Sequence, residues 1–190
     1  MESDLTFEPL TERNWQDFVT LFGERGACAG CWCMWFRVTS REFEAGKGEG
    51  NREAMQQLVK SGKVPGILAY LTGVPVGWCS VAPREEYKRL QNSRILKPVD
   101  EQPVWSVVCL FVDKESRGSG VAIGLLRAAV EFVRERGGTI VEGYAIEPKG
   151  ERMPALFAYH GPAAAFLKAG FKEVARRSKR RPIMRYTFTD

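Results

Sequence analysis

An almost uninterrupted apolar run, VWSVVCLFV at residues 104–112, leads within a few positions into a glycine turn, RGSG at 117–120. A run without polar alternation is typical of a central strand that is covered on both faces. Beyond the turn, Leu125, Ala129 and Val133 lie at the spacing of one helical face. The sequence therefore predicts a strand, a tight turn and a helix, within a sheet that carries helices on both faces.

This turn also carries the strongest chemical signal. The first turn of a helix leaves several backbone N–H groups without partners, and glycines let a ligand approach the backbone closely. Together with the positive end of the helix dipole, they form a cradle for a pyrophosphate, and Arg117 adds a positive charge. The alternative is a plain turn whose glycines serve only tight packing. The turn is neither a Walker loop nor a dinucleotide fingerprint, because the lysine and the third glycine are absent.

Length and composition limit the class of protein. The chain has 190 residues, 44% of them hydrophobic, which suits one domain with a sizeable core. A net charge of +5 is compatible with an anionic ligand but is too small to indicate nucleic-acid binding. The N-terminus, MESDLTFEPL, lacks the features of a secretory signal, and no apolar run approaches the about 18 residues of a membrane span. We expect a cytoplasmic protein with reduced thiols and no membrane partner.

Periodicity and turn residues predict the other elements. In the first half we expect a strand at 5–10, a helix from Thr11 to Gly23, a mobile loop at 44–51, a helix capped by Asn51 that ends at Gly62, and a hairpin over 66–82. In the second half we expect a short surface helix within 84–93, a strand at 139–146, a polar loop, a helix at 162–170, and closing strands at 171–177 and 182–188.

Two segments resemble known signatures. RGSGVA at 117–122 resembles the Arg/Gln-x-x-Gly-x-Gly/Ala signature of the GNAT superfamily of N-acetyltransferases, and it follows an apolar strand that ends in LFVD. FLKAGFKEV at 166–174 is similar to the second signature of that family, a helix followed by Gly-Phe and a strand. The resemblance covers roughly residues 66–188, and the whole chain looks like a bacterial subgroup of unassigned substrate.

The resemblance implies an α/β (α+β) GNAT fold, with a mixed, mostly antiparallel, twisted sheet and helices on both faces. Residues 1–190 would form one domain, with a helical acceptor-side segment at about 11–64 and a cofactor-binding core at about 66–188. The implied activity is N-acetyl transfer from acetyl-CoA to the amine of a small molecule or peptide, by direct attack. The alternative is a non-catalytic acyl-CoA-binding or regulatory module. A homodimer stays open.

The family pattern also assigns cofactor contacts. The central strand would carry a bulge and separate from its parallel neighbour at 139–146, which opens a slot for the cofactor. Within this slot, the backbone of Leu110, Phe111 and Val112 would pair with the pantetheine arm. The pyrophosphate would be held by the N–H groups of Arg117, Gly118, Ser119, Gly120, Val121 and Ala122.

Proton transfer is less well specified. The family often places a tyrosine four residues before the Gly-Phe glycine, but here that residue is Phe166, which can pack against the pantetheine but cannot donate a proton. Glu142 and Tyr144 share one face of their strand, so Glu142 is a candidate base if that face meets the slot. The alternative is an ion-paired or solvated strand residue. His160, the single histidine, and Tyr159 are further candidates, although a lone loop histidine more often has no catalytic role.

The segment CAGCWCMWF at 28–36 places Cys28, Cys31 and Cys33 within six positions. A structural zinc site needs four ligands, and no second cysteine or histidine pair exists, so we predict no metal. A redox switch has only two arginines nearby to favour a thiolate. If the segment is helical, Cys28 and Cys31 share a face and Cys33 points away. Two interpretations are equally open, a pocket wall on the acceptor side or simple core filling, for these cysteines and for Trp32, Met34, Trp35 and Phe36.

A basic segment, ARRSKRRPIMR at 175–185, contains six positively charged residues. It is either a nucleic-acid or phosphate patch or the solvated turn of the last hairpin. Nucleic-acid modules usually add stacking aromatic residues or a reading helix, and neither is evident here. We therefore expect the hairpin and no nucleic-acid partner.

Overall fold

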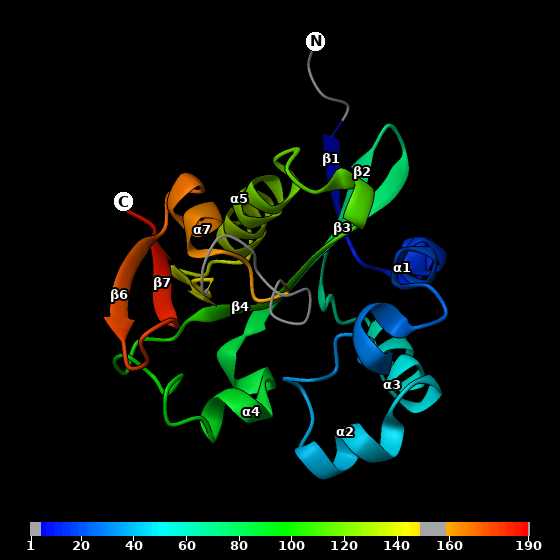
Figure 1. Cartoon of the computed structure of the whole chain (residues 1–190), viewed down its shortest axis with the longest axis horizontal. Helices are drawn as coiled ribbons and strands as arrows, with labels where there is room; N and C mark the ends of the chain where they lie inside the picture. Colours follow the sequence, from blue (N-terminus) through cyan, green and yellow to red (C-terminus); the bar gives the residue numbers. More distant parts are fainter. Residues whose placement is uncertain (1–4, 149–158, 190) are drawn as a thin grey trace.

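A computed structural model describes residues 5–148 and 159–189, and Figure 1 shows a twisted sheet with helices on both faces. The sheet has seven strands in the order β1-β2-β3-β4-β5-β7-β6, and only the β4–β5 pair is parallel. The predicted mixed, mostly antiparallel sheet is therefore confirmed. The strands are β1 (Leu5–Pro9), β2 (Gly66–Leu71), β3 (Val74–Pro83), β4 (Trp105–Val112), β5 (Ile140–Tyr144), β6 (Lys172–Arg176) and β7 (Pro182–Thr187).

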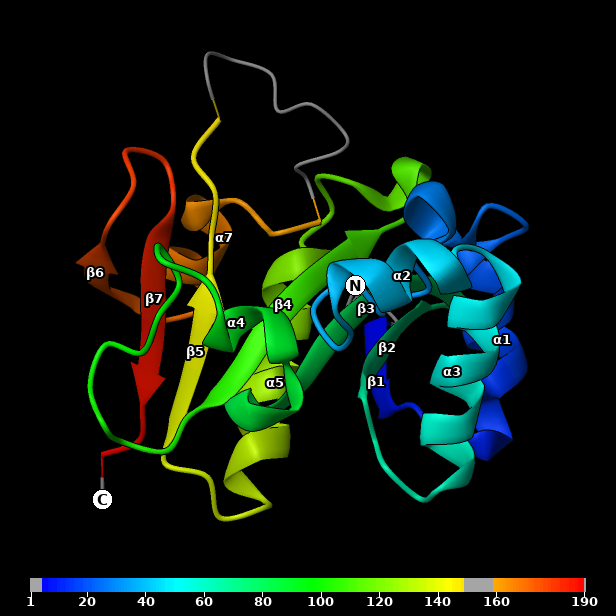
Figure 2. The same ribbon diagram turned by 90° about the horizontal axis from the view of Figure 1, so that it is seen from below.

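The helices divide between the two faces of the sheet, as Figures 1 and 2 show. One face carries α5 (Val121–Arg134) and α7 (Ala163–Lys168), and the other carries α1 (Trp15–Phe22), α2 (Ser40–Gly46), α3 (Glu49–Lys60) and α4 (Lys88–Gln91). Short helical turns lie at η1 (Glu12–Asn14), η2 (Gly26–Gly30), η3 (Arg84–Glu86) and η4 (Lys114–Ser116). The helices of the described residues are all too short or too polar to cross a lipid bilayer.

Each face has its own apolar core. The predicted stripe of α5, which includes Leu125 and Ala129, packs on β2, β3 and β4. On the other face, Phe18 of α1 and Met55 of α3 pack around Trp78 of β3, all of them fully buried. Since β3 and β4 are covered on both sides, their near-continuous apolar sequences match their place in the middle of the sheet.

Two irregularities of β4 open the sheet. In the β3–β4 ladder, Ser80 pairs with Cys109 but Val81 pairs with Val107, so Val108 is an extra residue on β4. The parallel pairing with β5 extends over only three residues, Trp105–Val107 opposite Val141–Gly143. Beyond them β4 and β5 separate (Figure 2). The predicted bulge and separation are both confirmed.

The predicted mobile loop at 44–51 is wrong. Helix α2 continues to Gly46 and α3 begins at Glu49, so a short link at Lys47 and Gly48 joins them. Asn51 does not cap a helix either. It lies inside α3 with 2% of its surface exposed, and its Nδ2 donates a hydrogen bond to the Gly30 carbonyl at 3.1 Å. The glycines at 46, 48 and 50 suggested a loop, but tertiary packing of Asn51 holds the helix against η2.

The cysteine segment is not a regular helix, so the helical arrangement considered for it is wrong. Its backbone forms consecutive tight turns, with positive φ at Ala27, Ala29, Trp32 and Cys33. Such angles are unfavourable for side-chain-bearing residues and persist only where the surroundings enforce them. Here the Gly30 carbonyl accepts from Gly48 N and from the Asn51 side chain. The Trp32 ring stacks on Phe22, with centroids 5.7 Å apart.

The basic segment forms the β6–β7 hairpin, as predicted, and its arginines bind other parts of the chain. Arg176 forms ion pairs with Glu147 and Glu173, both at 2.7 Å. Arg177 donates to the main-chain carbonyls of residues 97 and 98, and Arg180 donates to the carbonyl of Glu147. These contacts show that the arginines of the basic segment hold the hairpin against neighbouring parts of the chain.

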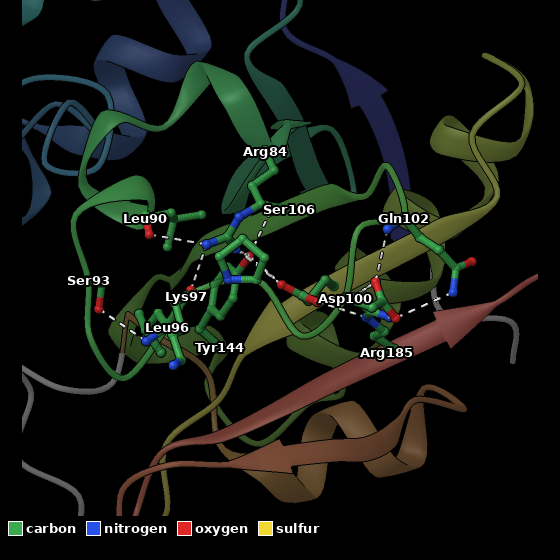
Figure 3. Close-up of polar contacts among 12 residues, drawn as sticks. Arg84, Leu90, Ser93, Leu96, Lys97, Asp100, Gln102, Ser106, Tyr144 and Arg185 are labelled. Atoms are coloured by element: carbon green, nitrogen blue, oxygen red, sulfur yellow. Dashed lines mark hydrogen bonds and ion pairs between the residues drawn. The ribbon is translucent and has the colours of Figure 1, made fainter.

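A buried polar network joins the sheet to the chain that precedes β4 (Figure 3). Glu142, which is fully buried, accepts at Oε1 from Arg84 Nη1 at 3.2 Å and from the Tyr144 hydroxyl at 2.7 Å. Its Oε2 accepts from Arg185 Nε at 2.7 Å. Arg185 also donates to both carboxylate oxygens of Asp100, and Arg84 donates to the carbonyls of residues 90 and 96. The network therefore fastens residues 90–100 onto β5 and β7.

The substitution Glu142→Gln should destabilise the fold. Removal of one partner from a buried ion pair leaves uncompensated charge, here on Arg84, while Arg185 keeps only Asp100, and this costs about 3 kcal/mol or more. Urea denaturation should show this loss of unfolding free energy. The matched control Glu131→Gln removes an exposed pair with Arg134 on α5 and should cost about 0.5 kcal/mol or less. Equal effects for the two variants would contradict a stabilising role for the network.

Candidate active site

Two cavities meet on the side of the molecule where β4 and β5 separate. The first, the β4–α5 cavity, has a volume of about 640 Å³ and lies between the end of β4 and the start of α5. The second, the thiol cavity, has a volume of about 340 Å³ and lies beneath the cysteine segment. Ala27, Cys28, Phe111 and Tyr159 line both, so the two cavities adjoin.

The β4–α5 cavity brings together most residues that the GNAT resemblance assigned to the cofactor. Eight of those ten line it, and Ser119 and Phe166 are not among its lining residues. Phe166 is fully buried instead, and a Cβ atom added at Gly143 would lie 2.1 Å from its ring. Phe166 therefore packs beneath β5 as part of the core. The eight are Leu110, Phe111, Val112, Arg117, Gly118, Gly120, Val121 and Ala122.

The turn before α5 has the geometry of an anion cradle. Gly118 and Gly120 take φ of 83° and 86°, which is the left-handed region that favours glycine. Gly120 directly precedes α5, whose first N–H groups have no partner within the helix. Arg117 is exposed beside the turn, and its Nε donates to the Val112 carbonyl at 3.2 Å. This arrangement can bind a pyrophosphate through backbone N–H groups and the helix dipole.

The slot between β4 and β5 already contains part of the chain. Leu110 N donates to the Tyr159 carbonyl at 2.6 Å, and Ile146 N donates to the Gly161 carbonyl at 3.0 Å. A Cβ atom added at Gly161 would lie 2.6 Å from the Leu110 side chain. Residues 159–161 therefore bridge the separated strands. A ligand whose carbonyl accepts a hydrogen bond from the Leu110 amide must therefore displace the Tyr159 carbonyl from that amide.

The thiol cavity is apolar and rich in sulfur. Cys28, Cys31, Cys33 and Cys109 line it, and Glu44 and Lys47 are the charged residues among its described lining. The two interpretations of the cysteine segment, a pocket wall and core filling, therefore each apply to part of it. Cys28, Cys31 and Trp35 line the cavity, Trp32 and Met34 belong to the core, and Cys33 and Phe36 do both. The remaining lining residues are Phe22, Ala27, Ala29, Phe43, Val108, Phe111 and Tyr159.

The cysteines are free thiols in different environments. All five are unpaired, and within residues 5–148 and 159–189 no group of three or more potential ligands is arranged to hold a metal ion. Burial raises the pKa of Cys31 to about 11. At Cys33 burial acts in the same direction, but the neighbouring Cys109 thiol and the indole N–H of Trp78 outweigh it and lower the pKa to about 7. The Trp78 bond is 3.1 Å long.

Three of the candidates for proton transfer, Glu142, Tyr144 and His160, lie outside both cavities, whereas Tyr159 lines both. Glu142 and Tyr144 do share one face of β5, but that face holds the buried network. His160 is 7% exposed, and its Nδ1 has no hydrogen-bond partner among the described residues. Burial and the nearby charge of Arg181 lower the pKa of His160 to about 3, so its imidazole is neutral at physiological pH. The catalytic roles of Glu142, Tyr144 and His160 stay predictions, and the geometry of the cavities does not favour them.

Sequence reasoning named Tyr159 among the candidates, and the structure places it in the lining of both cavities. It missed Cys109, and it missed that Cys33 differs from its neighbours. Alternation along β4 was the available signal for Cys109, because Cys109 and Phe111 face away from Leu110. The environment of Cys33 depends on Trp78 and Cys109, which are distant in sequence.

Comparisons with known proteins agree with this geometry. Residues 21–161 match the Acetyltransferase (GNAT) family. No curated protein matches the chain at a significant level. The solved structures that resemble the chain include many GNAT acetyltransferases.

Three of these structures illustrate the similarity. The PaiA N-acetyltransferase of Thermoplasma acidophilum, in complex with coenzyme A, has a TM-score of 0.53 at 12% identity and covers 97% of this chain and 99% of its own. A GNAT acetyltransferase of Streptococcus agalactiae has a TM-score of 0.58 at 11% identity and covers 98% and 96%. An N-acetyltransferase of Staphylococcus aureus has a TM-score of 0.58 at 10% identity and covers 97% and 99%. At these identities the likeness shows the fold. Because the family match spans most of the sequence and coincides with the glycine turn and the separated strands, the chain belongs to the GNAT acetyltransferase family.

Proposed function

We propose that this protein transfers the acetyl group of acetyl-CoA to the nitrogen of a compact amine whose body is apolar. The observation that carries the proposal is the junction of the two cavities at Ala27, Cys28, Phe111 and Tyr159. One cavity suits a phosphate-bearing carrier and the other suits an apolar molecule. Their junction is the place where a thioester and an amine would meet.

The donor side fits acetyl-CoA. The amides at the start of α5 would bind the pyrophosphate, and Arg117 would add attraction for its charge. The pantetheine arm would run along Leu110 and Val112 and would take the place of the Tyr159 carbonyl at the Leu110 amide. Two neighbours of the same fold, the PaiA enzyme and a NatC complex bound to a Gag peptide, were solved with coenzyme A. Their fold supports the same donor here.

The acceptor side fits an apolar body. The thiol cavity of about 340 Å³ lies at the small end of the range for small-molecule sites. Aromatic rings and thiols form most of its described wall, and they offer few partners to a polyamine or a sugar. Residues of the predicted acceptor-side segment, 11–64, form one wall, and β4 forms the other. We infer that the amine nitrogen points toward Cys109 and the bulge at Val108, with its apolar part in the cavity.

A first test addresses the donor. Calorimetry should detect binding of CoA and acetyl-CoA to the wild-type protein. The substitution Gly120→Val places a β-branched residue at a φ of 86°, so it should displace the amides that precede α5 and weaken CoA binding by about tenfold or more. Gly50→Ala, in an exposed and open position of α3, is the matched control and should leave the affinity unchanged. Absence of any heat with wild-type protein would remove the proposed function.

A second test addresses the acceptor. Release of CoA from acetyl-CoA should be measured with methylamine, benzylamine, phenethylamine, tryptamine, lysine and spermidine. The aromatic amines should have the largest kcat/KM, because each buried methylene contributes about 0.8 kcal/mol, or roughly fourfold. A preference for spermidine or lysine would contradict an apolar acceptor. Binding of acetyl-CoA without acetylation of any amine would favour a non-catalytic acyl-CoA-binding module.

A further inference from the structure

Direct transfer to an amine requires a group that removes a proton from the nitrogen. Glu142 and Tyr144 are committed to the buried network, and neither lines the cavities. His160 also lies outside both linings. The titratable groups that do line the thiol cavity are Cys28, Cys31, Cys33, Cys109, Tyr159, Glu44 and Lys47.

Cys33 occupies a particular position among these groups. Its sulfur accepts the indole N–H of Trp78 at 3.1 Å, and Cys109 lines the same cavity. Cys109 immediately precedes Leu110, whose amide lies in the slot of the proposed pantetheine. Cys33 therefore lies between the acceptor cavity and the strand that would carry the thioester.

The surroundings of Cys33 favour a negative charge on its sulfur. Arg37 is 6% exposed, and its Nε has no partner among the described residues, although its other nitrogens bind Glu86, Tyr87 and the carbonyl of residue 65. Its positive charge helps to lower the pKa of Cys33. A thiolate that accepts the indole N–H of Trp78 and lies near a buried cation is a suitable proton acceptor near neutral pH.

The other groups that face Cys33 do not titrate in this range. Burial raises the pKa values of Cys31, Cys79 and Tyr87, and the interaction with Cys33, followed by burial, raises that of Cys109. These four groups are therefore protonated at pH 7, while Arg37 is charged. Among these groups, Cys33 should therefore be the one that loses its proton near pH 7 and changes the charge beside the acceptor cavity.

The backbone supports this selection. Trp32 and Cys33 take φ of 42° and 60°, two consecutive strained residues at the point where the chain turns toward β3 and β4. Strain of this kind often occurs at functional sites, where the surrounding structure holds a side chain in a required place. Here both side chains enter the core around Trp78, and Cys33 also lines the thiol cavity.

We propose that Cys33 is the catalytic base of this protein and that it relays the proton of the amine to the departing CoA thiolate. The proposal rests on the proposed function. The amine nitrogen attacks the thioester carbonyl, a C–N bond forms, and one N–H proton moves to the Cys33 sulfur. The thioester C–S bond breaks with its electron pair on the CoA sulfur. The proton then passes from Cys33 to this sulfur, since an ordinary thiol has a pKa of about 8.5 and holds the proton more strongly.

The first experiment needs no acceptor. The ultraviolet absorbance of thiolate should be titrated in the wild type, in Cys33→Ser and in Cys79→Ala, a matched control that removes a buried thiol lining neither cavity. The wild type and Cys79→Ala should show one thiolate with a midpoint near pH 7, and Cys33→Ser should not. Identical curves for wild type and Cys33→Ser would overturn the proposal. Thermal unfolding and CoA binding check that the variants are folded.

The second experiment uses the best amine of the panel. In the wild type, kcat should rise with pH through about 7, because Cys33 accepts a proton only after losing its own. Cys33→Ser should lose about a hundredfold or more in kcat together with this inflection, while its CoA affinity stays unchanged. Unchanged kcat in Cys33→Ser, or loss of the inflection in Glu44→Gln instead, would overturn the role of Cys33.

Mass spectrometry separates a base from a nucleophile. After incubation of the wild type with acetyl-CoA alone, Cys33 should carry no acetyl group. An acetylated Cys33 that an amine then discharges would show covalent transfer and would overturn the relay. If wild-type protein does not bind CoA at all, the proposed function fails, whereas CoA-dependent turnover that is insensitive to Cys33 contradicts this proposal alone.

Discussion

The separation of β4 from β5 is the constraint on which the site depends. A sheet is stabilised by continuous backbone pairing, but here the parallel ladder stops after three residues and leaves polar backbone groups of β4 unpaired with a neighbouring strand. The Tyr159 carbonyl satisfies the Leu110 amide, and the Arg117 side chain satisfies the Val112 carbonyl. The opened edge thus combines hydrogen-bonding groups with space for a ligand, and both cavities form around it.

Buried polar groups have two different uses in this molecule. The network around Glu142 is paired on every side, so it closes the sheet near Asp100 and holds the chain before β4 in place. The thiols near β4 are arranged differently, because Cys33 accepts one hydrogen bond from Trp78, and the charge of Arg37 helps to lower its pKa. The carboxylate of Glu142 is tied to its neighbours by several hydrogen bonds, whereas the pKa of the Cys33 thiol is lowered by its surroundings. The first arrangement provides rigidity and the second provides a group that can react.

The accuracy of the sequence predictions depends on the range of the interactions involved. The strand–turn–helix at 104–134, the hairpin at 66–83 and the last two strands follow local periodicity and turn residues, and the structure confirms them. The loop predicted at 44–51 and the helix considered for the cysteine segment are wrong, because Asn51 and Trp32 are held by residues from other elements. The prediction used local signals such as glycine content, and these carry no information about contacts between distant residues.

By itself, the sequence determined the central strand, the glycine turn and the following helix, because each depends on residues that are close along the chain. The resemblance of two short segments to GNAT signatures then implied the family of the fold and most residues of the β4–α5 cavity. Only the tertiary structure decided the environments of the titratable groups. Glu142 meets Arg84 and Arg185, and Cys33 meets Trp78 and Cys109, across long sequence separations. Burial, charge and hydrogen bonding set the behaviour of such groups, and these properties exist only when the elements pack together.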